Sequence, residues 1–222
     1  MDLDLSDRML SPSGFNQEQI RLLSERMQPC NTVLDLCTGL GNLAKDLAYQ
    51  GKTVYGLDID EESLEYATRN VGDEGSGIFY PVQGDARNLG YNSEFDGVSC
   101  ASSFDWENLD PVTAGIYRAL KPGGYFAVTG IENSMKERHT ALVGRDLDQR
   151  VKDGSLVFTD KDLEELGRMG ELIGTDEFKS SAEKIKGSSA KVVASLERNG
   201  FQIRNVQPFY EDTAYCVLAQ RD

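Results

Sequence analysis

The sequence predicts an α/β fold with a doubly wound, mostly parallel sheet, and three observations support that prediction. Short β-rich runs alternate with helical patterns from residue 32 to residue 131. A glycine turn directly follows the first of these runs, and only four residues, 210–213, link the last two predicted strands. Alternation at this spacing implies crossover connections and a parallel sheet covered on both faces. The short final link requires an antiparallel hairpin at the end of the sheet.

The individual elements follow from apolar spacing and turn residues. A leading helix is predicted over 15–27, because apolar side chains recur there at close to helical spacing between Pro12 and Pro29. The predicted strands are 32–36, 53–58, 78–83, 95–100, 124–131, 201–209 and 214–219. The other core helices are predicted at 42–50, 61–70, 111–120 and 191–199. We expect 1–222 to form one domain, with 1–29 as an N-terminal helical cap.

Residues 133–187 are more than the alternating core needs. Their helical pattern begins at Thr159-Asp160, and its apolar face consists of Leu163, Leu166, Met169, Leu172 and Ile173. The segment follows strand 124–131 at the carboxyl edge of the sheet, where ligands bind in open α/β folds. We therefore expect a helical insertion that serves as a substrate lid. Self-association as a homodimer through this insertion, or simple surface packing, are the alternatives.

Gly39 and Gly41 form the tight turn between strand 32–36 and the next helix. Glycine lets a ligand approach bare backbone, and the first turn of a helix presents unpaired N–H groups to an anion. Two ligand classes suit this geometry, because Gly39-x-Gly41-x-x-Ala44 also satisfies the loose dinucleotide pattern. Asp35 favours S-adenosylmethionine over a dinucleotide. A carboxylate there repels a diphosphate but attracts the ammonium and sulfonium groups of S-adenosylmethionine.

The run Asp35-x-Cys37-x-Gly39-x-Gly41 resembles the first motif of the class I S-adenosylmethionine-dependent methyltransferases, acidic-x-Gly-x-Gly-x-Gly, with Cys37 in place of the first glycine. Residues 53–58, 78–86, 95–101 and 119–124 are similar to later motifs of that family, in the same order. The resemblance implies a Rossmann-like seven-stranded sheet and S-adenosylmethionine as the cofactor. The cofactor-binding residues expected from it are Asp35, Cys37, Thr38, Gly39, Gly41, Asp58, Ile59, Asp85, Ala86 and Ala101.

Three of these positions carry specific expected roles. Asp58 ends a β-rich strand and is expected to accept hydrogen bonds from the ribose hydroxyls, which an acidic residue also does in dinucleotide sites. In the family pattern an apolar residue such as Ile59 lies against the adenine ring. An Asp at position 85 binds the adenine amino group, and a small residue at position 86 lies beneath the ring.

Catalytic and substrate-binding residues are less well marked. Glu132 and Asn133, at the end of strand 124–131, are expected to face the substrate, with a helix-capping role as the alternative. His139 is the only histidine and is a candidate base. The alternative is that it lies on a solvated helix. Phe104 and Trp106 are predicted to line the substrate site, and the alternative is that they pack in the core. A base is optional, because aligning the reactants alone contributes about 7–11 kcal/mol.

Composition excludes several classes of function. The net charge is −14 and the pI is near 4.5, so we expect no nucleic-acid partner. The sequence has no apolar run of membrane-spanning length, and we expect a soluble, cytoplasmic protein without a membrane partner. Four widely spaced cysteines resemble neither a zinc site nor a disulfide framework, so no metal is predicted.

The sequence therefore predicts an enzyme that transfers a methyl group from S-adenosylmethionine to a small-molecule acceptor by in-line displacement, mainly through positioning and desolvation. The alternatives are a methyltransferase that acts on a protein or RNA, a non-catalytic S-adenosylmethionine-binding module, and a dehydrogenase. The acceptor atom is not defined by the sequence.

Overall fold

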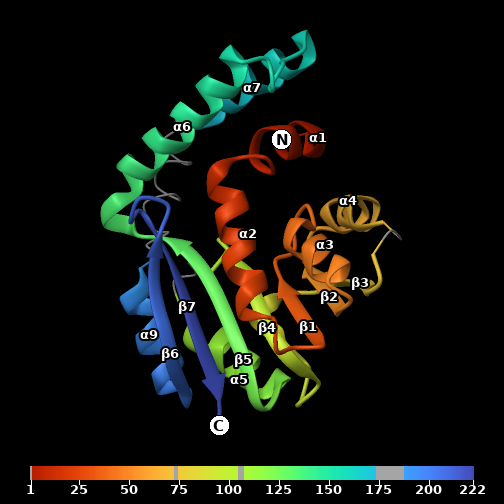
Figure 1. Ribbon diagram of the computed structural model, residues 1–222, viewed down its shortest axis with the longest axis vertical. Helices are drawn as coiled ribbons and strands as arrows, with labels where there is room; N and C mark the ends of the chain where they lie inside the picture. The colour runs from red at the N-terminus through yellow and green to blue at the C-terminus, as the bar shows by residue number, and fades with distance from the viewer. Residues whose placement is uncertain (1, 73–74, 105–107, 174–187) are drawn as a thin grey trace.

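One seven-stranded sheet runs through the protein with the strand order β3-β2-β1-β4-β5-β7-β6 (Figure 1). The computed structural model describes residues 2–72, 75–104, 108–173 and 188–222. Neighbouring strands are parallel from β3 to β5, whereas β7 is antiparallel to both β5 and β6. The strands are β1 (Thr32–Leu36), β2 (Thr53–Asp58), β3 (Ile78–Gln83), β4 (Phe95–Ala101), β5 (Leu120–Ile131), β6 (Phe201–Phe209) and β7 (Ala214–Arg221). The predicted doubly wound fold with its closing hairpin is confirmed.

Helices cover both faces of the sheet (Figure 1). One face packs against α2, α3 and α4, and the other packs against α5 and α9. The helices in the described ranges are α1 (Leu3–Leu10), α2 (Gly14–Arg26), α3 (Asn42–Tyr49), α4 (Glu61–Val71), α5 (Asp110–Ala119), α6 (Lys136–Lys152), α7 (Asp160–Ile173) and α9 (Ser189–Arg198). Short 3-10 turns, η1 (Ala86–Asn88) and η2 (Asn133–Met135), follow β3 and β5.

Burial along the strands follows their order in the sheet. Val33, Leu34, Val98 and Cys100 on the central strands are fully buried, because helices cover both of their faces. Edge strand β3 instead leaves Ile78 about half exposed. Pro81 in the same strand has no backbone N–H to donate to a further strand, and proline is tolerated at a sheet edge for that reason. The central strands β1 and β4 therefore form the rigid base from which the turn at residues 37–41 projects.

The structure departs from the predicted elements mainly at β5 and at α1, and the ends of other elements differ by one or two residues. Strand β5 begins at Leu120 and not at residue 124, because Leu120 is buried and pairs with Phe95 ahead of the turn in which Gly123 adopts φ +79°. Helix α1 was not predicted as a separate helix because it has only eight residues, although Leu3, Leu5, Met9 and Leu10 make half of them apolar. Asp2 caps it by accepting hydrogen bonds from the backbone of residues 4 and 5, and contacts with distant residues hold it in place.

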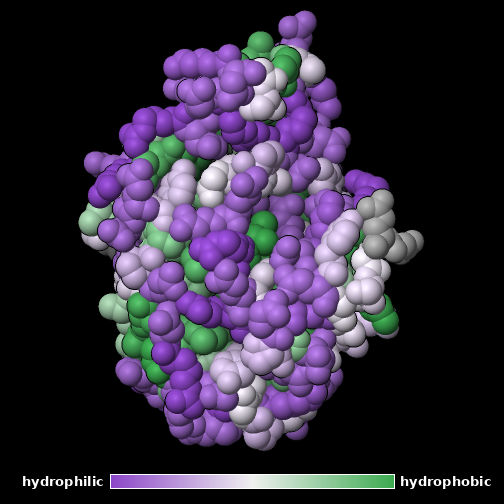
Figure 2. All heavy atoms as spheres, in the orientation of Figure 1, coloured by the Kyte–Doolittle hydropathy of each residue, from purple (hydrophilic) through white to green (hydrophobic). Residues whose placement is uncertain are grey.

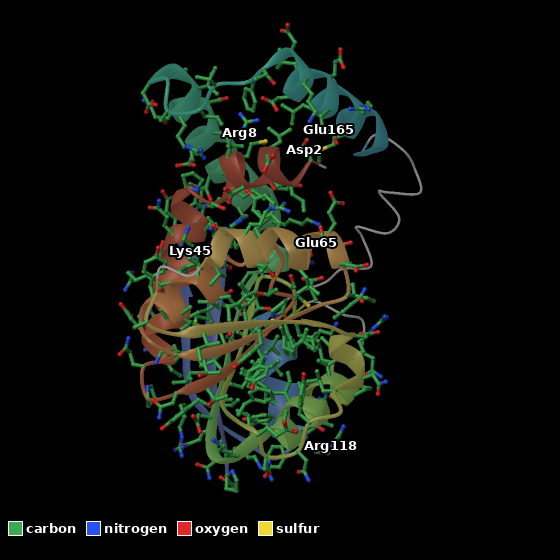
Figure 3. All side chains as sticks on the ribbon, turned by 90° about the vertical axis from the view of Figure 1, so that its right-hand side faces the viewer. Asp2, Arg8, Lys45, Glu65, Arg118 and Glu165 are labelled. Atoms are coloured by element: carbon green, nitrogen blue, oxygen red, sulfur yellow. The ribbon has the colours of Figure 1, made fainter. Side chains whose placement is uncertain are left out.

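The predicted insertion contains α6 and α7, and both lie beyond the carboxyl end of β5 (Figure 1). Residues 174–187 of the insertion lie outside the described part of the chain. Figure 3 shows α1, with Asp2 and Arg8, between α7 and α4. Arg8 forms an ion pair of 2.6 Å with Asp162, and the Arg150 guanidinium donates to the carbonyls of Arg8 and Met9 at 2.5 and 2.7 Å. The N-terminal cap and the insertion are thus joined to each other.

The surface in Figure 2 is mostly hydrophilic, with separate small hydrophobic areas, in keeping with the net charge of −14. Within the described ranges, no helix has the length and apolar content that a membrane span requires.

Candidate cofactor site

The turn at residues 37–41 has an unusual backbone. Cys37, Gly39 and Gly41 all lie in the left-handed region, with φ of +54°, +51° and +77°. Gly41 also packs closely on α4, because a Cβ at this position would come within 2.9 Å of the Ala67 Cβ. Helix α3 starts immediately after Gly41 without a side-chain cap. The turn therefore presents bare backbone and uncapped helical N–H groups at the carboxyl end of β1.

The Asp35 side chain is hydrogen-bonded to Thr38 in this turn. Its side chain is 2% exposed, and its two carboxylate oxygens accept hydrogen bonds from Thr38 Oγ1 at 2.8 Å and Ser99 Oγ at 2.9 Å. Burial raises the pKa of Asp35 to about 6, with a smaller contribution from the negative charge of Asp58, while the two hydroxyl contacts act in the opposite direction. The carboxylate is thus directed at two hydroxyls of the protein. The expected attraction to a cofactor ammonium group stays a prediction.

Asp58 and Ile59 lie beside the turn at the end of β2. The Asp58 carboxylate accepts hydrogen bonds from the backbone N–H groups of Gly39 at 2.9 Å and Asp60 at 3.1 Å. The Ile59 side chain is 64% exposed, which is unusual for a large apolar residue next to a buried strand. A strand-end carboxylate beside an exposed apolar side chain fits a ligand with a ribose and a flat aromatic base. The residues present therefore suit an adenosine-containing cofactor.

Asp85 and Ala86 follow β3 at the next strand end. Asp85 lines an open pocket of about 440 Å³, together with residues that include Leu57 and Gly84. Ala86 is buried, whereas the Asp85 carboxylate forms a bidentate pair with the Arg87 guanidinium, with one N–O distance of 2.7 Å. This pair, together with the Arg87 backbone N–H, lowers the pKa of Asp85. The carboxylate predicted to bind the adenine amino group is therefore held by Arg87 in this structure.

The segment after β4 was predicted to supply cofactor and substrate contacts. Ala101 ends β4 and is half-buried, next to the turn. Phe104 is 1% exposed and packs against Phe126 with ring centroids 5.2 Å apart, so it belongs to the hydrophobic core. This is the packing alternative that the sequence left open for Phe104. Trp106 lies outside the described residues.

Glu132 and Asn133 at the end of β5 have separate surroundings. The Glu132 carboxylate accepts hydrogen bonds from the Ser189 backbone N–H at 3.0 Å and from the Ser189 hydroxyl, so it caps the start of α9. Asn133 borders an open pocket of about 740 Å³. Its other lining residues are Ser134, Lys136, Glu137 and Thr140. The structure thus places Asn133 at a pocket mouth and Glu132 in a capping contact.

His139 is buried on α6 and not on a solvated helix face. Its ring is 4.5 Å from the Phe15 ring in an edge-to-face arrangement, and Nδ1 lies 2.9 Å from Thr213 Oγ1. Burial lowers the pKa of His139. These contacts join α6, α2 and the link between β6 and β7. A role as a catalytic base stays a prediction, because the observed contacts are those of a packing residue.

Two residues near the site, Ser99 and Gln19, were not predicted from the sequence. Ser99 pairs with Asp35 in the parallel register of β1 and β4, so the register provides the signal once these strands are placed side by side. Gln19 on α2 gave no such signal, because Ser102 and Thr129, which donate to its side-chain oxygen, lie more than 80 residues away. Among the described residues, no group of three or more His, Cys, Asp or Glu side chains could hold a metal ion.

Residues 33–124, which include this turn and the next three strands, match the family described as a methyltransferase domain. These residues are a methyltransferase domain. The match and the methyltransferase relatives agree with the resemblance to the class I, S-adenosylmethionine-dependent type that the sequence motifs indicated. The domain's glycine turn and strand-end acids are the features that sequence reasoning assigned to this family.

Two curated relatives each match about half of this chain. An uncharacterised methyltransferase from Synechocystis sp. is 36% identical over 117 residues, which are 51% of this chain and 53% of that protein. A ubiquinone biosynthesis O-methyltransferase from Thiobacillus denitrificans is 32% identical over 115 residues, which are 50% of this chain and 49% of that protein. The chain therefore spans about half the length of these curated relatives.

Solved structures match over more of the chain. A Pyrococcus horikoshii protein matches with a TM-score of 0.64 and 20% identity, covering 97% of this chain and 95% of that chain. The magnesium protoporphyrin IX methyltransferase from Synechocystis, with bound S-adenosylhomocysteine, matches with a TM-score of 0.62 and 17% identity, covering 93% and 83%. At these identities the likeness shows the fold.

Proposed function

We propose that this chain transfers a methyl group from S-adenosylmethionine to a small-molecule acceptor. The observation that carries the proposal is the strand-end arrangement around residues 37–41, where left-handed backbone, the Asp58 carboxylate and the exposed Ile59 side chain meet. These features suit an adenosine-containing cofactor. The relatives named as a ubiquinone biosynthesis O-methyltransferase and as a sterol methyltransferase-like protein support a small acceptor. The net charge of −14 argues against a phosphate backbone as the substrate.

Methyl transfer requires mainly that the protein position the two reactants. When bound, the cofactor supplies an activated methyl group on a sulfonium sulfur. We assign the adenosine half to Asp58, Ile59 and Ala86, and the methionine half to the backbone of the turn and of Ala101. The protein would hold the acceptor in line with the methyl group and exclude water, which together contribute most of the rate.

We also propose that the insertion closes the acceptor side of the site. Its first helix begins next to the pocket bordered by Asn133, and the contacts of Arg8 and Arg150 attach it to the N-terminal cap. Such a cover would exclude water from the acceptor. A general-base role for Glu132 or His139, and a homodimer through the insertion, stay predictions.

Calorimetry with S-adenosylmethionine, S-adenosylhomocysteine and NAD tests the cofactor assignment. We expect binding of the two adenosyl compounds and none of NAD, and the reverse result would replace the proposal with a dehydrogenase. Transfer from S-adenosylmethionine with a radiolabelled methyl group, offered a metabolite extract divided by size, then tests the acceptor. We expect label in a product of the small-molecule fraction that chromatography separates from unreacted S-adenosylmethionine. Label in the macromolecular fraction would indicate a protein or RNA substrate, and cofactor binding without any transfer would indicate a non-catalytic module.

A further inference from the structure

Gln19 is a buried polar side chain at the junction of α2 with the sheet. It is 5% exposed, and its Oε1 accepts hydrogen bonds from Ser102 Oγ at 2.5 Å and Thr129 Oγ1 at 2.9 Å. Its Nε2 donates to Asn16 Oδ1 at 3.1 Å on the same helix. One amide oxygen from α2 thus binds hydroxyls from the end of β4 and from β5. Buried polar groups require such partners, and losing one is costly.

Ser102 is held in a strained conformation at the cofactor edge of the sheet. It directly follows Ala101, the last residue of β4, and adopts φ +60°, which a residue with a side chain rarely does. Its backbone N–H donates to the carbonyl and to the hydroxyl of Thr129, both at 3.2 Å. The exit of β4 therefore keeps its shape through contacts with β5 and with Gln19. A left-handed residue persists only where its surroundings determine it.

The segment ahead of Gln19 is attached to the other side of the glycine turn. Asn42, the first residue of α3 after Gly41, donates from Nδ2 to Ser11 Oγ at 2.6 Å. Asn70 in turn donates to Asn42 Oδ1 at 3.2 Å and to the carbonyl of Leu40 in the turn at 2.8 Å. Figure 1 shows α2 between β5 and α3, in agreement with its contacts to both. Residues 11–19 thus bind both sides of the turn.

We propose that Gln19 is a positioning residue for the cofactor: by binding Ser102 and Thr129, it sets the backbone at 101–102 and couples docking of α2 to cofactor binding. This inference rests on the proposed function, which assigns the backbone of Ala101 to the methionine half. Without the amide oxygen, two hydroxyls lose an acceptor and Ser102 relaxes from its left-handed conformation. Coupling of this kind is reciprocal, so the cofactor must also stabilise α2.

Three variants test the proposal. Gln19→Met keeps the length of the side chain but removes the acceptor, and Gln19→Glu retains an oxygen for both hydroxyls. Ser24→Ala is the matched control, because Ser24 is a buried residue of the same helix whose hydroxyl binds Asp46 in α3, away from β4. For Gln19→Met we expect the Kd of S-adenosylhomocysteine to rise about tenfold, within the range of ordinary coupling energies. We expect a change of less than about threefold for Gln19→Glu, and a lower Tm with unchanged Kd for Ser24→Ala.

Hydrogen exchange of the wild-type chain provides a second readout that does not depend on a variant folding. We expect S-adenosylhomocysteine to slow amide exchange in α2 more than in α5, which lies on the opposite face of the sheet. Wild-type Kd in Gln19→Met, or α2 exchange that is unaffected by the ligand, would overturn the role of Gln19 while leaving the cofactor assignment intact. Failure of the wild-type chain to bind S-adenosylhomocysteine would instead overturn the proposed function.

Discussion

Replacing Asp35 by asparagine tests the electrostatics beneath the glycine turn. The carboxylate is fully buried between the hydroxyls of Thr38 and Ser99, and burial raises its pKa to about 6 from a usual value of 3.8. Asparagine has nearly the same shape. Its oxygen can accept from one hydroxyl and its amide can donate to the other, so Asp35→Asn removes the charge while retaining the contacts.

The sign of the pH dependence follows from the raised pKa. Between about pH 3.8 and 6 the folded state binds more protons at Asp35 than the unfolded state does, so the free energy of unfolding falls as the pH rises. Over the whole titration of Asp35 the free energy of unfolding falls by about 3 kcal/mol, and about 1 kcal/mol of this fall occurs between pH 5 and 8. Above about pH 7 the buried charge is almost fully formed, and its destabilising contribution is nearly complete.

Urea unfolding at pH 5, 6, 7 and 8 measures this contribution. We expect the free energy of unfolding of Asp35→Asn, relative to the wild type, to increase by about 1 kcal/mol from pH 5 to pH 8. Asp85→Asn is the control, because the Arg87 guanidinium lowers the pKa of Asp85 and its titration lies below this range. A difference between Asp35→Asn and wild type that does not change with pH would refute the reasoning.

Three further perturbations test other parts of the structure. Gly41→Ala should lower the free energy of unfolding by about 2–4 kcal/mol, because it combines a positive φ with a contact to α4. Gly123→Ala, with φ +79° but no contact closer than 4.0 Å, should lose only about 1–2 kcal/mol in the same urea assay, and equal losses would contradict the close packing. Asp58→Ala should weaken S-adenosylhomocysteine binding by about 1–3 kcal/mol in calorimetry, and unchanged affinity would show that the ribose lies elsewhere. Arg8→Met should speed proteolysis between α6 and α7 and make it less dependent on salt, whereas Arg168→Met, which removes an ion pair within α7, should match the wild-type rate.

The sheet could be predicted from the sequence because its signals are local. Apolar β-rich runs bounded by turn residues define β1, β2, β3 and β6 within their observed limits, and the short link 210–213 fixes the antiparallel hairpin. Helix α1 was not assigned from the sequence, since it has only eight residues and its attachments are to residues such as Asp162 and Arg150, more than 140 positions away. Contacts over such distances are properties of the folded chain and leave no periodic pattern.

The candidate site also has features that could be predicted from the sequence and features that could not. Strand-end residues such as Asp58 and Ile59 could be placed because a parallel sheet brings its carboxyl ends to one edge. The partners of individual side chains could not: the Arg87 pair of Asp85 and the contacts of Glu132 with Ser189 depend on rotamers and on a distant helix. His139 was assigned a solvated face as its alternative position, because its neighbours on α6 are charged. In the structure its ring packs against Phe15 from α2.

The left-handed turn also makes one thiol chemically distinct. Of the four cysteines, only Cys37 is partly accessible, while Cys30, Cys100 and Cys216 are buried. Burial raises the pKa of Cys30 and Cys216 to about 11, and contact with Cys37 together with burial raises the pKa of Cys100 further above its usual range. Alkylating reagents at neutral pH should therefore label residue 37 first. A fluorophore attached there would lie in the bend between β1 and α3, where its emission could report directly on ligand occupancy.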